Sequence, residues 1–131
     1  MDKIITELTG YMYRIETFNK DMAQDGEALH SFLIELCNTM ARANFLMAEY
    51  QREFRKQKRV AYTNMVASQV ATEKYFAPSL AKDYVDAQCA EVGYVYDMAE
   101  RLSRLCTHVM DCVRTIISSL KQERIFAQYG T

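Results

Sequence analysis

Apolar side chains recur along most of this sequence at alternating spacings of four and three residues. The first long series is Leu29, Leu33, Leu36, Met40, Ala43, Met47, Tyr50 and Phe54. The second is Val92, Val95, Ala99, Leu102, Cys106, Val109, Val113, Ile116 and Leu120. This spacing puts each series on one side of an α-helix, in the a/d pattern of helices that pack side by side. The pattern predicts an all-α, coiled-coil-like chain built from long amphipathic helices.

The scarcity of turn-forming residues supports the same fold class. The 131 residues include one Pro and four Gly. An all-β sandwich needs a turn about every 8–12 residues, which these few residues do not supply. No two glycines lie close enough to form the phosphate-binding loop of a Rossmann or P-loop enzyme. These classes are therefore excluded.

Only two places in the sequence carry signals for a helix break. Pro78 disfavours a helical residue before it, and Ser79 can start a new helix. Residues 24–27 contain a capping Asp followed by Gly, which fits either a turn or one continuous helix, because the apolar phase survives across them. We predict a single domain over residues 1–131, with helices over about 2–22, 26–75 and 79–126.

The predicted helices are too long to be enclosed by a small globule. At about 1.5 Å per residue, each of the two long helices would span roughly 70–75 Å. We therefore expect an elongated antiparallel hairpin with a short N-terminal helix, completed by other copies of the chain as a homo-oligomer. The last helix carries a wide apolar stripe and is the expected oligomer interface, through Val92, Val95, Leu102, Val109, Val113, Ile116 and Leu120.

The sequence also predicts where the protein works. No run of about 18 uncharged apolar residues is present, so no membrane span is expected. The first residues meet an acidic side chain before any apolar run, unlike a signal peptide. We expect a cytoplasmic protein, in the host cell if it is encoded by a phage. The four cysteines, Cys37, Cys89, Cys106 and Cys112, are then expected to be reduced thiols.

No arrangement of residues asks for catalysis or a cofactor. Glu27 and His30 share one helix face, but a di-iron site needs that pair twice, with further carboxylates. His108 and Cys112 are one helical turn apart and lack a second pair of metal ligands. We expect neither an enzyme, nor a metal site, nor a cofactor.

Charge is distributed unevenly behind a formal net charge of -1. Residues 2–36 carry three basic and seven acidic side chains, whereas residues 52–59 carry five basic and one acidic. We call Arg52, Arg55, Lys56, Lys58 and Arg59 the basic patch. Cationic side chains neutralise phosphates, and neighbouring aromatic side chains such as Tyr62 offer surfaces for unstacked bases. The patch predicts single-stranded nucleic-acid binding; the alternative is an ordinary solvated helix face.

The order of these features resembles the UvsY-type recombination mediators of bacteriophages. The resemblance covers residues 29–126. It rests on the basic, aromatic end of the long helix, Tyr50-Gln-Arg-Glu-Phe-Arg-Lys-Gln-Lys-Arg-Val-Ala-Tyr62, on the following break, and on the last helix. That helix contains Tyr94-x-Tyr96-x-x-Ala99-x-x-Leu102-x-x-x-Cys106 and closes with Ile116-Ile-Ser-Ser-Leu-Lys-Gln-Glu-Arg124.

The resemblance implies a function without catalysis. Proteins of this family form helical rings, bind single-stranded DNA and help to load a recombinase onto DNA covered by single-strand-binding protein. Carried over to this sequence, DNA contact would fall on the basic patch and oligomer contact on residues 92–120. The slightly acidic net charge departs from this pattern, because it weakens long-range attraction to DNA. The competing hypothesis is a helical protein–protein module without a nucleic-acid role, such as a virion component or an inhibitor of a host protein.

Overall fold

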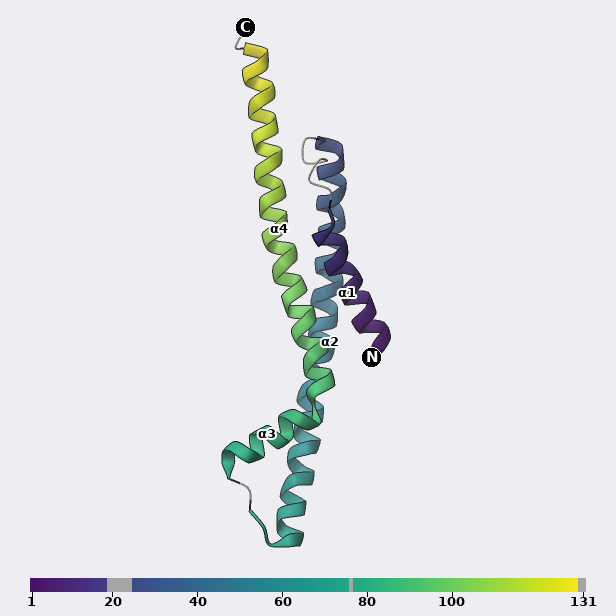
Figure 1. Cartoon of the computed structure of the whole chain (residues 1–131), viewed down its shortest axis with the longest axis vertical. Helices are drawn as coiled ribbons and strands as arrows, with labels where there is room; N and C mark the ends of the chain where they lie inside the picture. The colour runs from purple at the N-terminus through teal and green to yellow at the C-terminus, as the bar shows by residue number, and fades with distance from the viewer. Residues whose placement is uncertain (19–24, 76, 130–131) are drawn as a thin grey trace.

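The protein is an elongated bundle of α-helices (Figure 1). The computed structural model describes residues 1–18, 25–75 and 77–129. In that part of the chain it contains helices α1 (Asp2–Glu16), α2 (Gly26–Thr72), α3 (Pro78–Gln88) and α4 (Ala90–Tyr129), and no strand. The predicted all-α class is confirmed.

Helices α2 and α4 run antiparallel and form the long axis of the molecule (Figure 1). Side-chain hydrogen bonds between α2 and α4 fix how the helices align. Ser103 Oγ donates to Asn44 Oδ1 at 2.6 Å, and further along, Gln51 Nε2 donates to the Tyr96 hydroxyl at 3.4 Å. With a rise of about 1.5 Å per residue, α2 is roughly 70 Å long and α4 roughly 60 Å. The predicted hairpin of two long helices is present.

The two apolar series predicted from the sequence form the contact between these helices. Every position in both series is buried or half-buried. The most deeply buried include Leu29, Leu36 and Leu102, each at most 1% exposed. Burial of this kind stabilises by about 25 cal/mol per Å² of apolar surface, so the seam between α2 and α4 is the main source of stability.

Helix α1 packs against the first half of α2 and against α4 (Figure 1). Leu8 is its one fully buried side chain among the described residues and joins the same core as Leu36 and Leu102. Just beyond the helix, the Phe18 ring stacks on Phe32, with ring centroids 3.9 Å apart. Helix α4 thus contacts both α2 and α1, which explains the width of its apolar stripe.

The helix predicted over 79–126 is instead two helices, α3 and α4, which meet in a bend at Cys89. The Cys89 N–H donates to the Asp86 carbonyl three residues earlier, at 3.2 Å, so the ladder tightens and the chain changes direction there. The bend allows α3 to cross the end of α2, where a second small core forms from Ala61, Met65, Val85 and Cys89. No Gly or Pro marks this bend, because tertiary packing causes it.

Three other helix ends differ from the predicted ranges. Helix α1 ends at Glu16 rather than 22, where the Thr17 hydroxyl donates to the Tyr13 carbonyl at 2.8 Å; the predicted residues 19–22 lie outside the described residues. Helix α2 ends at Thr72 rather than 75, because Glu73 takes a left-handed conformation with φ 55°. Helix α4 continues to Tyr129, three residues past the predicted end.

The start of α2 answers the question left open at residues 24–27. Asp25 is extended, and its carboxylate accepts from the backbone N–H groups of Glu27 and Ala28 at 3.0 and 3.3 Å. This is an N-cap, so a helix begins here; residue 24 lies outside the described residues. At the other predicted break, Pro78 occupies the first position of α3, where its missing N–H costs no hydrogen bond.

Gly93 sets how closely α4 approaches α2. A Cβ atom added at Gly93 would lie 2.9 Å from Cε2 of Phe54, closer than packed atoms tolerate. The Phe54 ring is itself held on other sides, since it stacks parallel to Tyr96 and lies under the Lys58 ammonium. Only glycine therefore allows the ring to sit against the helix backbone.

A pair of glycine substitutions is expected to change stability in opposite directions. Gly10→Ala places a methyl group in open space inside α1 and should raise the free energy of unfolding by up to about 1 kcal/mol, the gain in helix propensity. Gly93→Ala has the same propensity gain but displaces the Phe54 ring, which costs about 1–3 kcal/mol. Urea denaturation should therefore show Gly93→Ala no more stable than the parent. Equal stabilisation by both substitutions would contradict the close packing at Gly93.

Candidate nucleic-acid interface

Four members of the basic patch point away from the rest of the molecule. Arg52, Arg55, Lys56 and Arg59 are all exposed on α2. Arg52 and Lys56 each stand two residues from Phe54, which faces α4, and two residues correspond to about 200° around a helix. Within the described residues, none of the four has an ion-pair partner. Their charges are therefore directed at solvent and available to a ligand.

Lys58 has a different environment from the other four. Its Nζ lies 3.6 Å from Oδ1 of Asp86 on α3 and 4.5 Å from the centroid of the Phe54 ring. Both partners belong to the same chain, so Lys58 links α3 to α2. Sequence spacing does not reveal this role, because Asp86 approaches only through the bend at Cys89.

Of the aromatic side chains beside the patch in the described part of the chain, only Tyr62 is well placed to contact bases. It is 58% exposed and lies three residues beyond Arg59, on the same side of α2. Phe54 is half-buried against Gly93 and Tyr96, and Tyr50 is half-buried against the main core. These two rings stabilise the fold.

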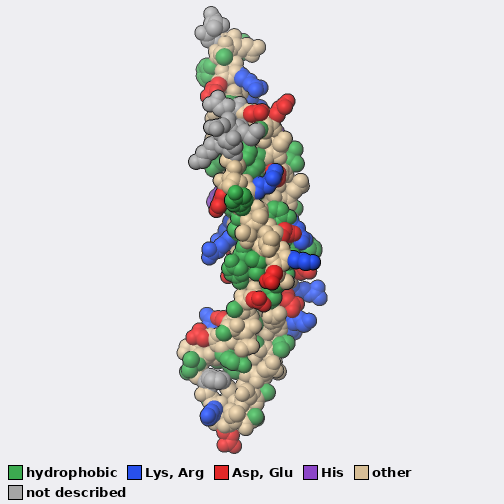
Figure 2. All heavy atoms as spheres, turned by 45° about the vertical axis from the view of Figure 1, so that its right-hand side comes forward, with side chains coloured by type: hydrophobic (Ala, Val, Ile, Leu, Met, Phe, Trp, Pro, Cys, Tyr) green, Lys and Arg blue, Asp and Glu red, His purple; other side chains and the backbone are tan. Residues whose placement is uncertain are grey.

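Acidic side chains lie beside the patch. Glu49 and Glu53 share a shallow cleft of about 300 Å³ on α2 with Tyr50, Arg52 and Lys56. Figure 2 shows the same mixture on a larger scale, with acidic and basic side chains intermingled around the middle of the molecule. The carboxylates reduce the positive potential away from the surface, so attraction to a polyanion acts at short range and is sensitive to salt.

The residues predicted to form the oligomer interface pack inside the single chain. Val92, Val95, Leu102 and Val113 are at most 3% exposed, and Val109, Ile116 and Leu120 are half-buried against the main core. The partner that covers this stripe is α2, with α1 beside it. The role of these residues in joining copies of the chain stays a prediction.

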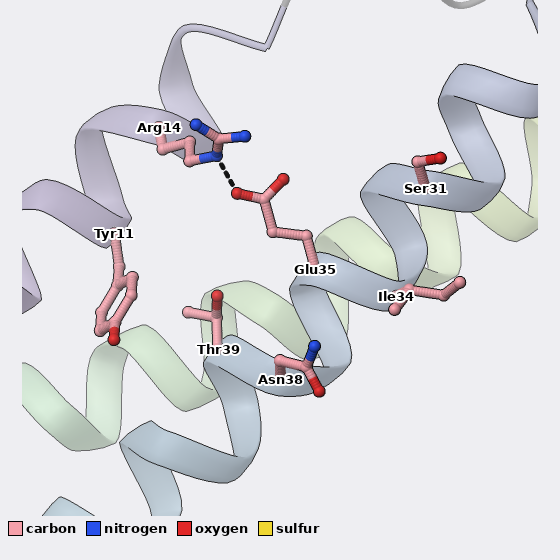
Figure 3. Close-up of a pocket in the computed structure, with 7 residues that line it drawn as sticks. All are labelled: Tyr11, Arg14, Ser31, Ile34, Glu35, Asn38 and Thr39. Carbon is pink, nitrogen blue, oxygen red and sulfur yellow. Dashed lines mark ion pairs between the residues drawn. The ribbon is translucent and has the colours of Figure 1, made fainter.

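Several clefts that the sequence did not indicate lie between helices. One, of about 460 Å³, separates α1 from α2 (Figure 3). Arg14 of α1 and Glu35 of α2 point toward each other across it and form an ion pair, with Tyr11 and Ile34 among the other lining residues. Another cleft lies between α2 and α3, at the opposite end of the hairpin from the start of α2. Neither of these two follows from helix periodicity, since both depend on how the helices cross.

The four cysteines divide into two buried and two exposed thiols. Cys89 and Cys106 are at most 1% exposed, and burial raises the pKa of both thiols above the ordinary cysteine value. Cys37 and Cys112 are exposed, and all four are free. Within the described residues, no three His, Cys, Asp or Glu side chains are grouped closely enough to hold a metal ion.

Thiol labelling should separate these two classes. Because the thiolate is the reactive form, we expect a maleimide at neutral pH to modify Cys37 and Cys112 rapidly in the native protein. Cys89 and Cys106 should react only after denaturation in urea. Mass spectrometry of peptides after a short labelling pulse measures the difference. Rapid native labelling of Cys106 would show that the contact between α2 and α4 is open in solution.

Comparisons of this chain with protein-family models, curated proteins and solved structures find no match. In the described part of the chain, no helix combines the length and apolarity needed to cross a membrane. The assignment of the site therefore depends on its own residues. What the structure brings together is an exposed cationic face on α2, with one exposed tyrosine beside it.

Proposed function

We propose that this protein binds single-stranded DNA through the exposed part of the basic patch. The observation that carries the proposal is the position of Arg52, Arg55, Lys56 and Arg59, which are exposed together and lack ion-pair partners within the described residues. Cations held on a rigid helix displace counterions from phosphates without first breaking contacts of their own. Tyr62 adds a surface on which an unpaired base can stack.

The shape of this region favours a flexible single strand over a duplex. The stretch from Arg52 to Tyr62 spans about 15 Å of α2, and its cations occupy a convex helix face. A single strand can bend to follow that face and expose its bases to Tyr62. One copy would contact only a few phosphates, so useful affinity requires several copies acting together.

The proposed role in the cell is that of an accessory factor without catalytic activity. Supported by the resemblance to UvsY-type mediators, we propose a homo-oligomer that assists a recombinase in loading onto DNA covered by single-strand-binding protein. Such a protein would work in the cytoplasm of a phage-infected host. The acidic side chains beside the patch fit this role, because a mediator has to release the strand as well as bind it.

Fluorescence anisotropy with a labelled oligonucleotide tests the proposal. We expect binding to single-stranded DNA at low salt, weaker binding to a duplex of the same length, and a linear fall of log affinity with log salt concentration. For three to four phosphates neutralised per copy, the slope for a single strand should be about -2 to -3. Absence of binding at low salt would contradict the proposal.

The second candidate function is a helical protein–protein module without a nucleic-acid role. The observation that favours it is the exposure of large apolar side chains on α2, including Ile34 at 63% and Phe45 at 58%. Ile34 also lines the cleft between α1 and α2, and exposed apolar side chains beside a cleft are typical of surfaces that bind other proteins. This function predicts no oligonucleotide binding, so the same anisotropy titration distinguishes the two candidates.

A further inference from the structure

The C-terminal end of α4 is an apolar helix end without a partner among the described residues. The Arg124 guanidinium reaches Gly26, where α2 begins, and α4 continues past that end of α2 (Figure 1). Three of them are large and apolar: Ile125 is 54% exposed, Phe126 73% and Tyr129 82%. We call residues 125–129 the C-terminal tip. Apolar side chains left this exposed on a rigid helix are costly in water.

The opposite end of the molecule offers an apolar cleft between α2 and α3. It has a volume of about 470 Å³, with Met65 and Val66 among its lining residues on α2 and Pro78 and Ala81 among those on α3. Its walls are fixed in advance by the small core around Cys89 and by the ion pair between Lys58 and Asp86. We call this the α2–α3 cleft. A preformed apolar cleft binds an apolar side chain without a large ordering cost.

The tip and the cleft of one chain cannot meet, because they lie at opposite ends of an elongated molecule (Figure 1). We infer that the C-terminal tip of one copy docks in the α2–α3 cleft of the next copy, joining chains head to tail. This inference deepens the oligomeric part of the proposed function by naming the two surfaces in contact.

The C-terminal tip and the α2–α3 cleft are complementary in charge as well as in apolar character. The last carbonyl groups of a helix lack partners within it and carry partial negative charge. Helix α4 has no basic side chain in its last turn to balance them. Lys82 lines the α2–α3 cleft, is exposed, and has no ion-pair partner within the described residues. Its ammonium group is suited to receive the carbonyl end of an incoming helix.

A head-to-tail contact has a consequence that a two-fold contact lacks. Each copy uses one surface and leaves the other free, so copies add until a ring closes or a filament grows. Every added copy brings another basic patch. A series of such patches gives a single strand the repeated contacts that one copy lacks.

Complementation between two variants tests the contact with the full chain. Phe126→Glu disables the tip, Val66→Glu disables the cleft, and Tyr13→Glu is the matched control at an exposed site on α1. In sedimentation velocity, we expect the parent and the control to form species larger than a dimer. Each single variant should show a dissociation constant raised by about 30-fold. An equimolar mixture of the tip and cleft variants has one intact contact and should form a dimer, with nothing larger.

Three results would overturn the inference: a monomeric parent, single variants that associate like the parent, or a mixture that stays monomeric. Circular dichroism checks that each variant keeps its helix content. If Val66→Glu does not fold, Lys82→Glu takes its place as the cleft variant. It should raise the dissociation constant about threefold relative to the parent. The control Lys74→Glu, on an exposed residue of the linker between α2 and α3, should leave it unchanged.

The tip variant separates this contact from DNA binding, whereas Val66→Glu does not, because Tyr62 also lines the α2–α3 cleft. Phe126→Glu leaves the basic patch untouched, so an oligonucleotide of a few nucleotides should bind it as it binds the parent. Loss of association without loss of short-oligonucleotide binding is the expected result. If the parent associates as described but binds no DNA, the proposed function fails and the head-to-tail contact stands. If the parent binds DNA but does not associate, the head-to-tail contact fails and DNA binding through the basic patch stands.

Discussion

Replacing Leu102 with alanine is expected to lower the free energy of unfolding by about 3 kcal/mol. Leu102 is fully buried, in the core that α1, α2 and α4 share. Truncating it removes apolar contacts and leaves a cavity that three rigid helices cannot easily close. Urea denaturation followed by far-UV circular dichroism measures the loss. The matched control is Leu80→Ala on α3, where the side chain is 58% exposed; a change of at most about 0.5 kcal/mol is expected there.

The same experiment distinguishes a core inside one chain from an interface between chains. If Leu102 packs within the chain, its loss destabilises by the same amount at every protein concentration. If Leu102 instead joins two subunits, its replacement should mainly weaken association, and the apparent stability should vary with concentration. Denaturation at several concentrations thus compares the observed packing with the interface predicted from the sequence.

Helix periodicity predicted the core of the hairpin because one physical rule decides it. Leu36 and Leu102 fall on apolar stripes with the spacing of an α-helix, and two such stripes are buried most simply against each other. The break at Pro78 was also predictable, since it depends on a local property of one side chain. A cap at Asp25 was one of the two alternatives that the sequence left open. Features of this kind depend only on residues that are close together in the sequence.

The bend at Cys89 and the role of Lys58 were not predictable in this way. Cys89 is a small apolar residue that fits into a straight helix. The chain bends at this residue because α3 packs across α2. Lys58 looks like any other member of the basic patch until the bend brings Asp86 within 3.6 Å. The end of α2 at Glu73 was not predictable either. The left-handed residue at a helix end is usually a glycine, and here it is a glutamate. These features depend on contacts between distant segments.

The candidate surfaces likewise include one that the sequence predicts and others that depend on the tertiary structure. The sequence identified Arg52, Arg55, Lys56 and Arg59 as one helix face, and the structure leaves all four exposed. Their exposure needed only the period of the helix. The α2–α3 cleft and the exposed C-terminal tip needed the tertiary structure, because the crossing angle of α3 and the overhang of α4 set them.

The largest functional effect is expected from neutralising the patch. The triple variant Arg55→Ala, Lys56→Ala and Arg59→Ala should lower the affinity for single-stranded DNA about a hundredfold at low salt. It should also reduce the salt slope by about 2, because three fewer phosphates are neutralised. The three side chains are exposed, so the fold should not change. Tyr62→Ala should weaken binding further, by the stacking of about one base.

Anisotropy measured for this variant beside a charge-matched control tests the central claim most directly. The control, Arg101→Ala with Arg114→Ala and Lys121→Ala, removes the same charge from exposed positions on α4. If the basic patch is the DNA site, the patch variant loses binding and the control stays within about threefold of the parent, the effect of net charge alone. Equal losses in the two variants, or unchanged binding by the patch variant, would contradict the assignment of the DNA site to α2.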